Sequence, residues 1–287
     1  MPATSANLGP GYDSFGLALS RYDEVIAEVA DAGLHVAVTG SGHGEVALDE
    51  THLVVRAMRA AFDRLGGQPS GIRLDCRNEI PHGRGLGSSA AAIVSGIEVA
   101  RALTVGGHAL LDDDAALALA TELEGHPDNV AACLLGGLTI AWLDGGVGRA
   151  VRLAVQGIVP VLFIPPEQSA THAARAALPA LVPHSDAAFN LSRAALLIVA
   201  LTGRPELLLT ATQDRLHQGY RASSMAASAR LVERLRQAGI AAVISGAGSS
   251  VLALPSGPDQ VAATGALAPA GWERAELQVA GGASAGS

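Results

Sequence analysis

Residues 81–90 of the chain read Pro81–His82–Gly83–Arg84–Gly85–Leu86–Gly87–Ser88–Ser89–Ala90. The segment follows a predicted strand, in which Ile72, Leu74 and Cys76 alternate with charged residues, and it runs into a predicted helix of small residues. Glycines let backbone amides turn toward a bound anion, and a helix N-terminus carries partial positive charge. The two serine hydroxyls can hold phosphate oxygens or Mg²⁺. From the residues alone, a phosphate-binding loop and an ordinary glycine-rich connection with a serine N-cap are equally compatible with this segment.

The chain contains no lysine, so all 19 of its basic residues are arginines. This absence excludes mechanisms that need an ammonium side chain, such as the Walker A loop, the pyridoxal Schiff base and the phosphate-binding lysine of protein kinases. Any phosphate binding must then rely on backbone amides, helix ends, hydroxyls, arginines and metal ions. The net charge of −8 argues against a nucleic-acid partner.

The composition is that of a packed globular protein. Of the 287 residues, 49% are apolar and 16% are charged, which suits one large domain or two small ones. The longest apolar run, residues 194–201, is too short to cross a bilayer, and no signal segment opens the chain. The two cysteines lack the spacing of zinc ligands and are expected to be buried, reduced thiols. We therefore expect a cytoplasmic protein without a membrane partner.

Strands and helices alternate irregularly along the chain, which favours an α+β fold over a regular doubly wound sheet. Residues 1–13 and 125–129 have the composition of loops. The apolar patterns predict strands at 22–29, 34–38, 72–77, 138–143, 159–164, 240–244, 251–254 and 272–279. Helices are predicted at 52–65, 91–103, 112–122 (with Asp112 as N-cap), 170–178, 186–202, 204–217 and 231–238.

Four segments in separate parts of the chain resemble motifs of the GHMP kinases, and they occur in the order of that family. Residues 81–91 resemble the family's ATP loop, and residues 2–13 resemble the first motif in the form found in homoserine kinases. Residues 124–130 resemble a further homoserine kinase segment, and residues 245–250 resemble the third motif. One short glycine-rich motif is weak evidence, whereas four in the right order are highly specific.

The resemblance implies a two-domain GHMP-kinase-like fold of the α+β class. The N-terminal domain would be ribosomal-protein-S5-domain-2-like and would carry the ATP site, and the C-terminal domain would be ferredoxin-like. We place the boundary at the turn that ends with Gly146, which gives domains at 1–146 and 147–287. From about residue 281 the Gly, Ala and Ser residues predict a disordered tail.

The resemblance also implies the reaction, which is ATP-dependent phosphorylation of the L-homoserine hydroxyl to O-phospho-L-homoserine, a step of threonine biosynthesis. Such a kinase needs no lysine, in agreement with the composition. ATP and Mg²⁺ would be its cofactors, and dimers are common in the family. Two alternatives stay open: another GHMP kinase of the mevalonate type that acts on a different small alcohol, and a catalytically silent GHMP-fold protein that binds ligands.

The resemblance assigns the ATP site to one segment. The residues it implies there are Pro81, Gly83, Arg84, Gly85, Leu86, Gly87, Ser88, Ser89, Ala90 and Ala91. Magnesium would be held by Ser89 and by a carboxylate that precedes His126 in the chain. Glu124 is preferred for that carboxylate, and Glu122 is the alternative.

Homoserine is a zwitterion with one reactive hydroxyl, so its site needs donors for a carboxylate, an acceptor for an ammonium group and a group beside the hydroxyl. By resemblance, Arg175 and Arg221 bind the carboxylate, and Thr171 shares a predicted helix face with Arg175. The amino and hydroxyl end would be lined by Asn7, Asp13, His126 and Asn129.

The identity of a catalytic base stays open between three alternatives. Mevalonate-type enzymes use an aspartate in the position that resembles Asp128, and an aspartate like Asp13 is its rival. Direct in-line transfer without a strong base is the third alternative, because phosphoryl transfer relies mostly on positioning and charge neutralisation. We prefer Asp13 to Asp128, and we also place Asn129 at the catalytic centre.

Overall fold

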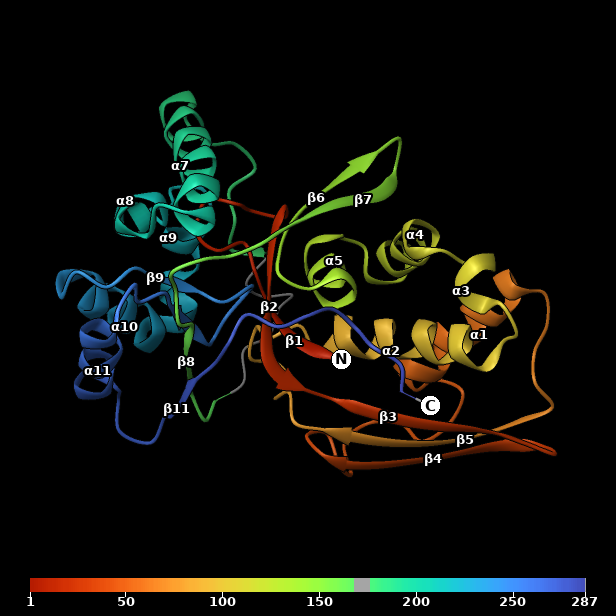
Figure 1. Ribbon diagram of the computed structural model, residues 1–287. Coiled ribbons are helices and arrows are strands. Elements are labelled where there is room, and N and C mark those ends of the chain that lie inside the picture. The colour runs from red at the N-terminus through yellow and green to blue at the C-terminus, as the bar shows by residue number, and fades with distance from the viewer. Residues whose placement is uncertain (168–175, 287) are drawn as a thin grey trace.

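The computed structural model describes residues 1–167 and 176–286, which form two lobes (Figure 1). The strands of the first lobe are β1 (Pro2–Ala6), β2 (Phe15–Tyr22), β3 (Glu24–Ala30), β4 (Gly33–Gly40), β5 (Gly71–Asn78), β6 (Leu138–Asp144) and β7 (Val147–Leu153). Its helices are α1 (Leu53–Leu65), α2 (Ser88–Leu103), α3 (Gly107–Leu110), α4 (Asp113–Glu124) and α5 (Asp128–Leu135). The strands of the second lobe are β8 (Val161–Ile164), β9 (Ala242–Ile244), β10 (Val251–Ala253) and β11 (Glu273–Glu276). Its helical elements are α7 (His184–Thr202), η1 (Pro205–Leu207), α8 (Leu208–Ala211), α9 (Gln218–Arg221), η2 (Ala222–Met225), α10 (Ala226–Gln237) and α11 (Pro258–Leu267).

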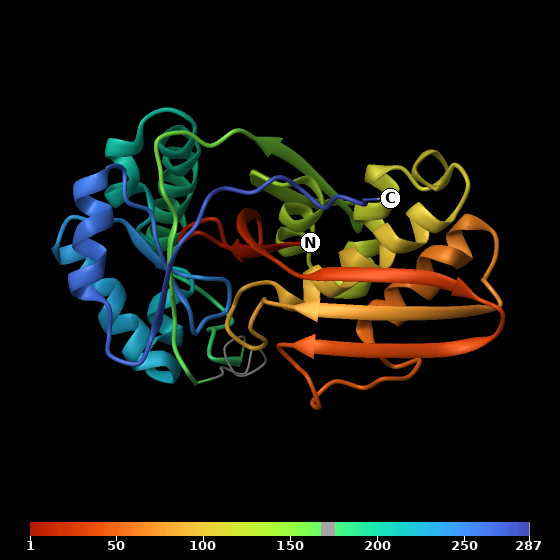
Figure 2. The ribbon, with the colours of Figure 1, turned by 60° about the horizontal axis from the view of Figure 1, so that its bottom comes forward.

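Two sheets build the first lobe, with strand orders β1-β2-β6-β7 and β3-β5-β4. The second sheet lies below α1 and α2, and Figure 2 shows its three strands side by side. In β5, Ile72, Leu74 and Cys76 are buried while Arg73 is exposed, so one face of this sheet packs inward and the other meets solvent, as the alternation predicted. Cys76 and Cys133 are buried free thiols, as expected, and burial raises the pKa of each to about 12.

The second lobe contains one antiparallel sheet of order β11-β8-β10-β9, and the core continues through it. The side chains of strand β8 alternate between the two faces of this sheet, and each face packs in a different core. Leu162 and Ile164 belong to the main core, which also includes the helices of the first lobe. Val161 and Phe163 face the other way and pack in a smaller core with Leu235 of α10. The main core therefore joins the two lobes.

The prediction of a loop over residues 1–13 is wrong for its first part, because Pro2–Ala6 is the fully buried strand β1. Small polar residues such as Thr4 and Ser5 have the composition of a loop, yet here their polar atoms are satisfied by distant segments. The hydroxyl of Thr4 donates to Asn129 Oδ1 (2.8 Å), and the hydroxyls of Ser5 and Ser245 are hydrogen-bonded to each other (2.8 Å). Pairing with β2 supplies backbone hydrogen bonds on one side of the strand, and the glycine-rich loop and the third motif supply others.

Several further elements differ from the sequence prediction. Helix α5 begins inside the predicted loop 125–129, and β7 and α11 were not predicted. The helix predicted at 204–217 is shorter in the structure, where it consists of η1 and α8 and ends at Ala211. The segment that follows is held by the carboxylate of Asp214, which accepts hydrogen bonds from the amides of the next turn. Asp112 caps α4 as predicted and accepts from the amide of Ala115 at 2.9 Å.

The hairpin of β6 and β7 bears on the domain boundary. The predicted boundary at Gly146 lies in the turn of this hairpin, and β7 pairs with β6 along its whole length within the first lobe. The end of the chain also returns to the first lobe (Figure 1), where the amide of Ala283 donates to the carbonyl of Cys133 at 2.8 Å. These hydrogen bonds fix the beginning of the segment for which disorder was predicted. We propose that the first lobe includes β7 and residues 277–283, and that the chain crosses to the second lobe after Leu153.

Among the residues described, α7 is the one helix whose length and hydropathy would allow it to cross a membrane. Length and composition are weak evidence for a membrane span, because core helices of folded proteins have the same properties. In the structure, Leu197 and Leu201 of α7 are buried in the main core, and Asn190 donates to the carbonyl of Pro10 at 2.8 Å. These contacts make α7 part of the folded second lobe.

Candidate active site

The glycine-rich loop before α2 has left-handed backbone conformations at alternate residues. The φ angle is +72° at Gly85 and +69° at Gly87, values that cost glycine no steric energy. The carbonyl of Leu86 accepts from the amide of Thr4 (3.0 Å), and the carbonyl of Gly85 accepts from the hydroxyl of Ser245 (2.7 Å). The first and third motifs thus hold the loop through its carbonyl groups.

The amides of the same loop are left available for a ligand. Those of Gly85, Leu86 and Gly87 donate no hydrogen bond to any other residue that the structure describes. Ser88 and Ser89 form the first turn of α2, where a helix provides no acceptor for the amides. The helix N-terminus adds partial positive charge at the same place. A row of unpaired amides with this charge suits the oxygens of a phosphate chain.

This row of amides borders a cavity of about 120 Å³ that collects residues from all four motifs. The predicted site residues that line it are Asn7, Asp13, Gly83, Gly85, Leu86, Gly87, Ser88, Ser89, Glu124, His126, Asp128, Asn129 and Arg221. The volume is smaller than that of a typical drug-sized ligand pocket and suits a small polar molecule beside a phosphate group. Residues far apart in sequence are therefore neighbours here, as the contact of Asn7 with Gly246, 239 positions away, illustrates.

Ser89 and Glu124 are in direct contact at one edge of this cavity. The Ser89 hydroxyl donates to Glu124 Oε2 at 2.6 Å. Burial raises the pKa of Glu124, and the hydrogen bond from Ser89 opposes that effect. Glu122, the alternative carboxylate, is exposed and forms an ion pair with Arg64 at 2.9 Å. Among the residues described, no three His, Cys, Asp or Glu side chains cluster as a metal site, so a cation here would need oxygen ligands from a bound phosphate as well.

Asp128 is 2% exposed and holds neighbouring groups of its own helix end. One of its oxygens, Oδ1, lies 2.7 Å from His126 Nδ1 and accepts from the amide of Asn129 at 2.8 Å. Asn129 in turn accepts from the hydroxyl of Thr4. Asp128 therefore orients the His126 ring and the Asn129 amide.

Asp13 lies on a turn of the first motif. The backbone of this turn is strained, and hydrogen bonds hold it in place. The φ angles of Asn7, Leu8 and Asp13 are +69°, +48° and +51°, in the left-handed region that non-glycine residues rarely adopt. Asn7 joins the turn to the third motif, because its Oδ1 accepts from the amide of Asp13 (2.9 Å) and its Nδ2 donates to the carbonyl of Gly246 (2.9 Å). The half-buried Asp13 carboxyl is thereby held at the cavity wall.

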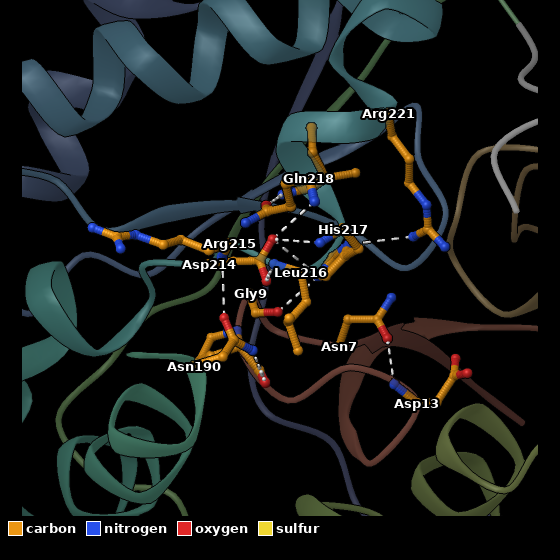
Figure 3. A network of polar contacts seen from close by, with 12 residues as sticks. Asn7, Gly9, Asp13, Asn190, Asp214, Arg215, Leu216, His217, Gln218 and Arg221 are labelled. Carbon is orange, nitrogen blue, oxygen red and sulfur yellow. Dashed lines mark hydrogen bonds and ion pairs between the residues drawn. The ribbon is translucent and has the colours of Figure 1, made fainter. Parts of the chain in front are cut away.

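Arg221 ends the short helix α9 and is 2% exposed, although it lines the cavity. Its Nη1 lies 3.3 Å from His217 Nδ1 (Figure 3). The same nitrogen lies 3.5 Å from the carbonyl of Gly246. The guanidinium also lies 5.6 Å from the centre of the Tyr12 ring. A buried positive charge at a small cavity is suited to binding a carboxylate.

Comparison with known families agrees with this geometry. Residues 52–137 match the GHMP kinases N terminal domain, and residues 197–268 match the GHMP kinases C terminal domain. The two matches together cover more than half of the chain. The chain belongs to the GHMP kinase family. It is accordingly an ATP-dependent kinase of small molecules, and the predicted family, fold class and enzyme class are confirmed.

Curated relatives place this GHMP kinase among the homoserine kinases. It is 62% identical to "Homoserine kinase" of Streptomyces coelicolor over 88% of this chain and 82% of that protein. It is 58% identical to "Homoserine kinase" of Streptomyces avermitilis over 97% of this chain and 92% of that protein. A solved homoserine kinase from Cytophaga hutchinsonii has 26% identity and a TM-score of 0.84, and covers 97% of this chain and 93% of that one. The mevalonate kinase of L. major, at 16% identity and a TM-score of 0.68, shares the fold.

Some predicted residues do not line the cavity of this GHMP kinase. The guanidinium of Arg84 donates to the carbonyls of Pro165 (3.0 Å) and Pro166 (2.5 Å), so it ties the loop to the second lobe. Those outside the set of lining residues are Pro81, Arg84, Ala90 and Ala91. Thr171 and Arg175 lie outside the residues that the structure describes.

A second cavity, of about 410 Å³, adjoins the first, because Ser88 and Ser89 line both. Apart from His82, which lies in the glycine-rich segment, sequence reasoning did not single out its other walls, since they come from scattered positions without a motif. Two of its polar atoms, His52 Nδ1 and Ser95 Oγ, are buried and have no hydrogen-bond partner among the described residues. Burial also lowers the pKa of His52, which disfavours the charged form of the ring. Unpaired polar atoms in a cavity lined by both polar and apolar residues are typical of a ligand site.

Proposed function

We propose that the protein transfers the γ-phosphate of ATP to the side-chain hydroxyl of L-homoserine, giving O-phospho-L-homoserine for threonine biosynthesis. The observation that carries the proposal is one cavity in which unpaired loop amides face a buried arginine and a carboxyl group. An assay of ADP release with L-homoserine, mevalonate and sugars tests it. L-homoserine should give the highest kcat/KM, and a clear preference for mevalonate or a sugar would replace the proposal by another GHMP kinase activity.

The triphosphate would lie along the amides of residues 85–89. Ser89 and Glu124 fit a magnesium ion, because a neutral hydroxyl and a carboxylate in contact are hard oxygen ligands and both line the cavity. When bound, Mg²⁺ would supply charge neutralisation on the phosphate oxygens. The chain itself contributes the amides and the α2 N-terminus, which replace the lysine that this protein lacks.

The adenosine moiety would occupy the second cavity. It is large enough for a nucleoside, it is continuous with the phosphate loop through Ser88 and Ser89, and it offers buried polar atoms to a base. Val25, Val46 and Val54 provide apolar surface on which a purine ring can pack.

Filling this second cavity is expected to weaken ATP binding alone. Ala92 lines it from α2, so Ala92→Phe should raise the KM for ATP by about tenfold, because overpacking costs roughly 1–3 kcal/mol. Initial rates at varied ATP and at varied L-homoserine measure the effect. Ala102→Phe, at an exposed position of the same helix, is the control and should leave both KM values unchanged. A larger change in the KM for L-homoserine than for ATP would contradict the assignment.

L-homoserine would bind in the first cavity. The Arg221 guanidinium would hold its carboxylate, and Thr171 and Arg175 stay in the proposed site by resemblance. The groups proposed around the amino and hydroxyl ends are Asn7, Asp13, His126 and Asn129. The order along the cavity would bring the hydroxyl toward the phosphate loop for in-line transfer.

Asp13 is the proposed base. Oδ1 of Asp128, its rival, lies 2.7 Å from His126 Nδ1 and accepts from the amide of Asn129. Asp13→Asn is expected to lower kcat by at least about tenfold, the low end for general-base catalysis. Single-turnover rates at saturating ATP and L-homoserine measure this loss, with Asp128→Asn beside it and melting temperatures for both. An unchanged kcat in Asp13→Asn would leave in-line transfer without a base as the mechanism.

We further propose that the enzyme works in the cytoplasm, without nucleic acid or membrane. Its net charge of −8 and the packing of α7 into the core support this location. The family resemblance also suggests a homodimer, which sedimentation of the purified protein would test.

A further inference from the structure

His217 lies directly behind Arg221 and is completely buried (Figure 3). One of its ring nitrogens contacts a hydrogen-bond acceptor, and the other contacts a hydrogen-bond donor. Nε2 lies 2.7 Å from the carbonyl oxygen of Gly9, which can only accept a hydrogen bond. Nδ1 lies 3.3 Å from Nη1 of Arg221, which can only donate one. One form of the ring satisfies both contacts, namely the neutral imidazole with its hydrogen on Nε2.

The ring is held in this orientation from several sides. Asp214 accepts hydrogen bonds from the amides of Leu216, His217 and Gln218 at 2.9, 3.1 and 2.8 Å, which sets the start of α9. The Tyr12 ring packs against the imidazole with 5.3 Å between centroids. Burial lowers the pKa of His217, while Asp214 nearby raises it. The net direction is downward, in agreement with the neutral ring that the hydrogen bonds require.

The guanidinium of Arg221 also approaches a backbone carbonyl on the same side as His217. The carbonyl of Gly246 is 3.5 Å from Nη1, and it already accepts from Asn7 at 2.9 Å. An arginine side chain has many rotamers, and the entropy lost on binding a carboxylate is smaller when the guanidinium is already oriented. A buried acceptor on the side away from the cavity provides such orientation.

We propose that His217 is a positioning residue for substrate binding: it accepts a hydrogen bond from the Arg221 guanidinium through Nδ1, is anchored to Gly9 through Nε2, and thereby directs the guanidinium toward the homoserine carboxylate. The inference rests on the proposed role of Arg221 in binding that carboxylate. Gly9 belongs to the first motif, so the same ring couples the position of Arg221 to the turn that carries Asp13.

Two substitutions separate this role from a structural one. In His217→Gln, the side-chain amide nitrogen can still donate to the Gly9 carbonyl, but no acceptor remains opposite Arg221. In His217→Asn, the side-chain oxygen lies near the former Nδ1 and can accept from Arg221, while the bond to Gly9 is lost. The two variants therefore each retain one of the two contacts.

Steady-state kinetics with L-homoserine and melting temperatures give the readout. We expect His217→Gln to raise the KM for L-homoserine about tenfold, the size of one hydrogen bond to a charged group, with little change in kcat or melting temperature. We expect His217→Asn to lower the melting temperature and to keep the KM within about twofold of the original. A KM that follows the loss of melting temperature in both variants would overturn the inference, and so would an unchanged KM in His217→Gln.

A double-mutant cycle with Arg221→Ala completes the test. Arg221→Ala should lower kcat/KM for L-homoserine by about 10²-fold or more, and adding His217→Gln should then change it by less than about twofold, because the group through which His217 acts is gone. A further tenfold loss in the double variant would overturn the role of His217 and leave the proposed role of Arg221 intact. If Arg221→Ala itself leaves kcat/KM unchanged, the proposed role of Arg221 fails, and the inference fails with it.

Discussion

Glu124→Gln is expected to reduce kcat by about 10²–10³-fold, the loss typical of removing one group that stabilises transition-state charge. The substitution keeps the shape of the side chain and its contact with the Ser89 hydroxyl, so the fold should persist. It removes the negative charge that a cation between Glu124 and Ser89 would need. The concentration of Mg²⁺ for half-maximal rate should rise in parallel, because the affinity of the proposed site for the ion falls.

Glu122→Gln is the matched control for this prediction. It lies two residues away on the same helix, is exposed, and pairs only with Arg64 among its described contacts. An exposed ion pair of this kind contributes about 0–1 kcal/mol, so kcat and the Mg²⁺ dependence should stay unchanged. Rates measured over a magnesium titration for both variants distinguish the two carboxylates. A loss in Glu122→Gln that equals or exceeds the loss in Glu124→Gln would reverse the assignment.

Gly87→Ala is expected to weaken ATP binding by about 10²-fold, since a displacement of about 1 Å in a positioned site can have an effect of this size. A Cβ at Gly87 would lie 1.9 Å from the Thr4 hydroxyl, whereas real Cβ contacts stay above 3.0 Å. The loop, β1 or the Thr4 side chain, which bonds to Asn129, must therefore move. The loop and β1 both carry the proposed phosphate site, because the amide of Thr4 holds the loop at Leu86.

Gly106→Ala is the matched control for Gly87→Ala. Gly106 is also the N-cap of a helix, has the same φ of +69°, and would place its Cβ in open space. Both variants incur a left-handed strain of about 1–2 kcal/mol. Only Gly87→Ala should lose ATP affinity, which calorimetric titration with a non-hydrolysable ATP analogue measures. Equal affinities in the two variants would show that the geometry of the loop does not matter for the triphosphate.

Local sequence was sufficient for the elements whose signals are short-range. The alternation in β5, the N-cap of α4 at Asp112 and the glycine-rich loop before α2 were all predicted, because each depends on neighbouring residues. The motif resemblance added the family, which the comparisons confirm. The absence of lysine already restricted phosphate binding to amides, helix ends, hydroxyls and arginines.

Long-range contacts account for what the sequence could not predict. β1 has the composition of a loop and becomes a strand because it pairs with β2 and because Thr4 bonds to Asn129, 125 residues away. The second cavity draws its walls from scattered positions, and nothing in the pattern around His217 indicates that its ring joins Gly9 to Arg221, 208 and 4 residues away. Periodicity and turn chemistry act over a few residues, so they determine helices, strands and loops. The pairing of unsatisfied polar groups across the fold requires the chain to be folded, and it alone decides which of these side chains face one another.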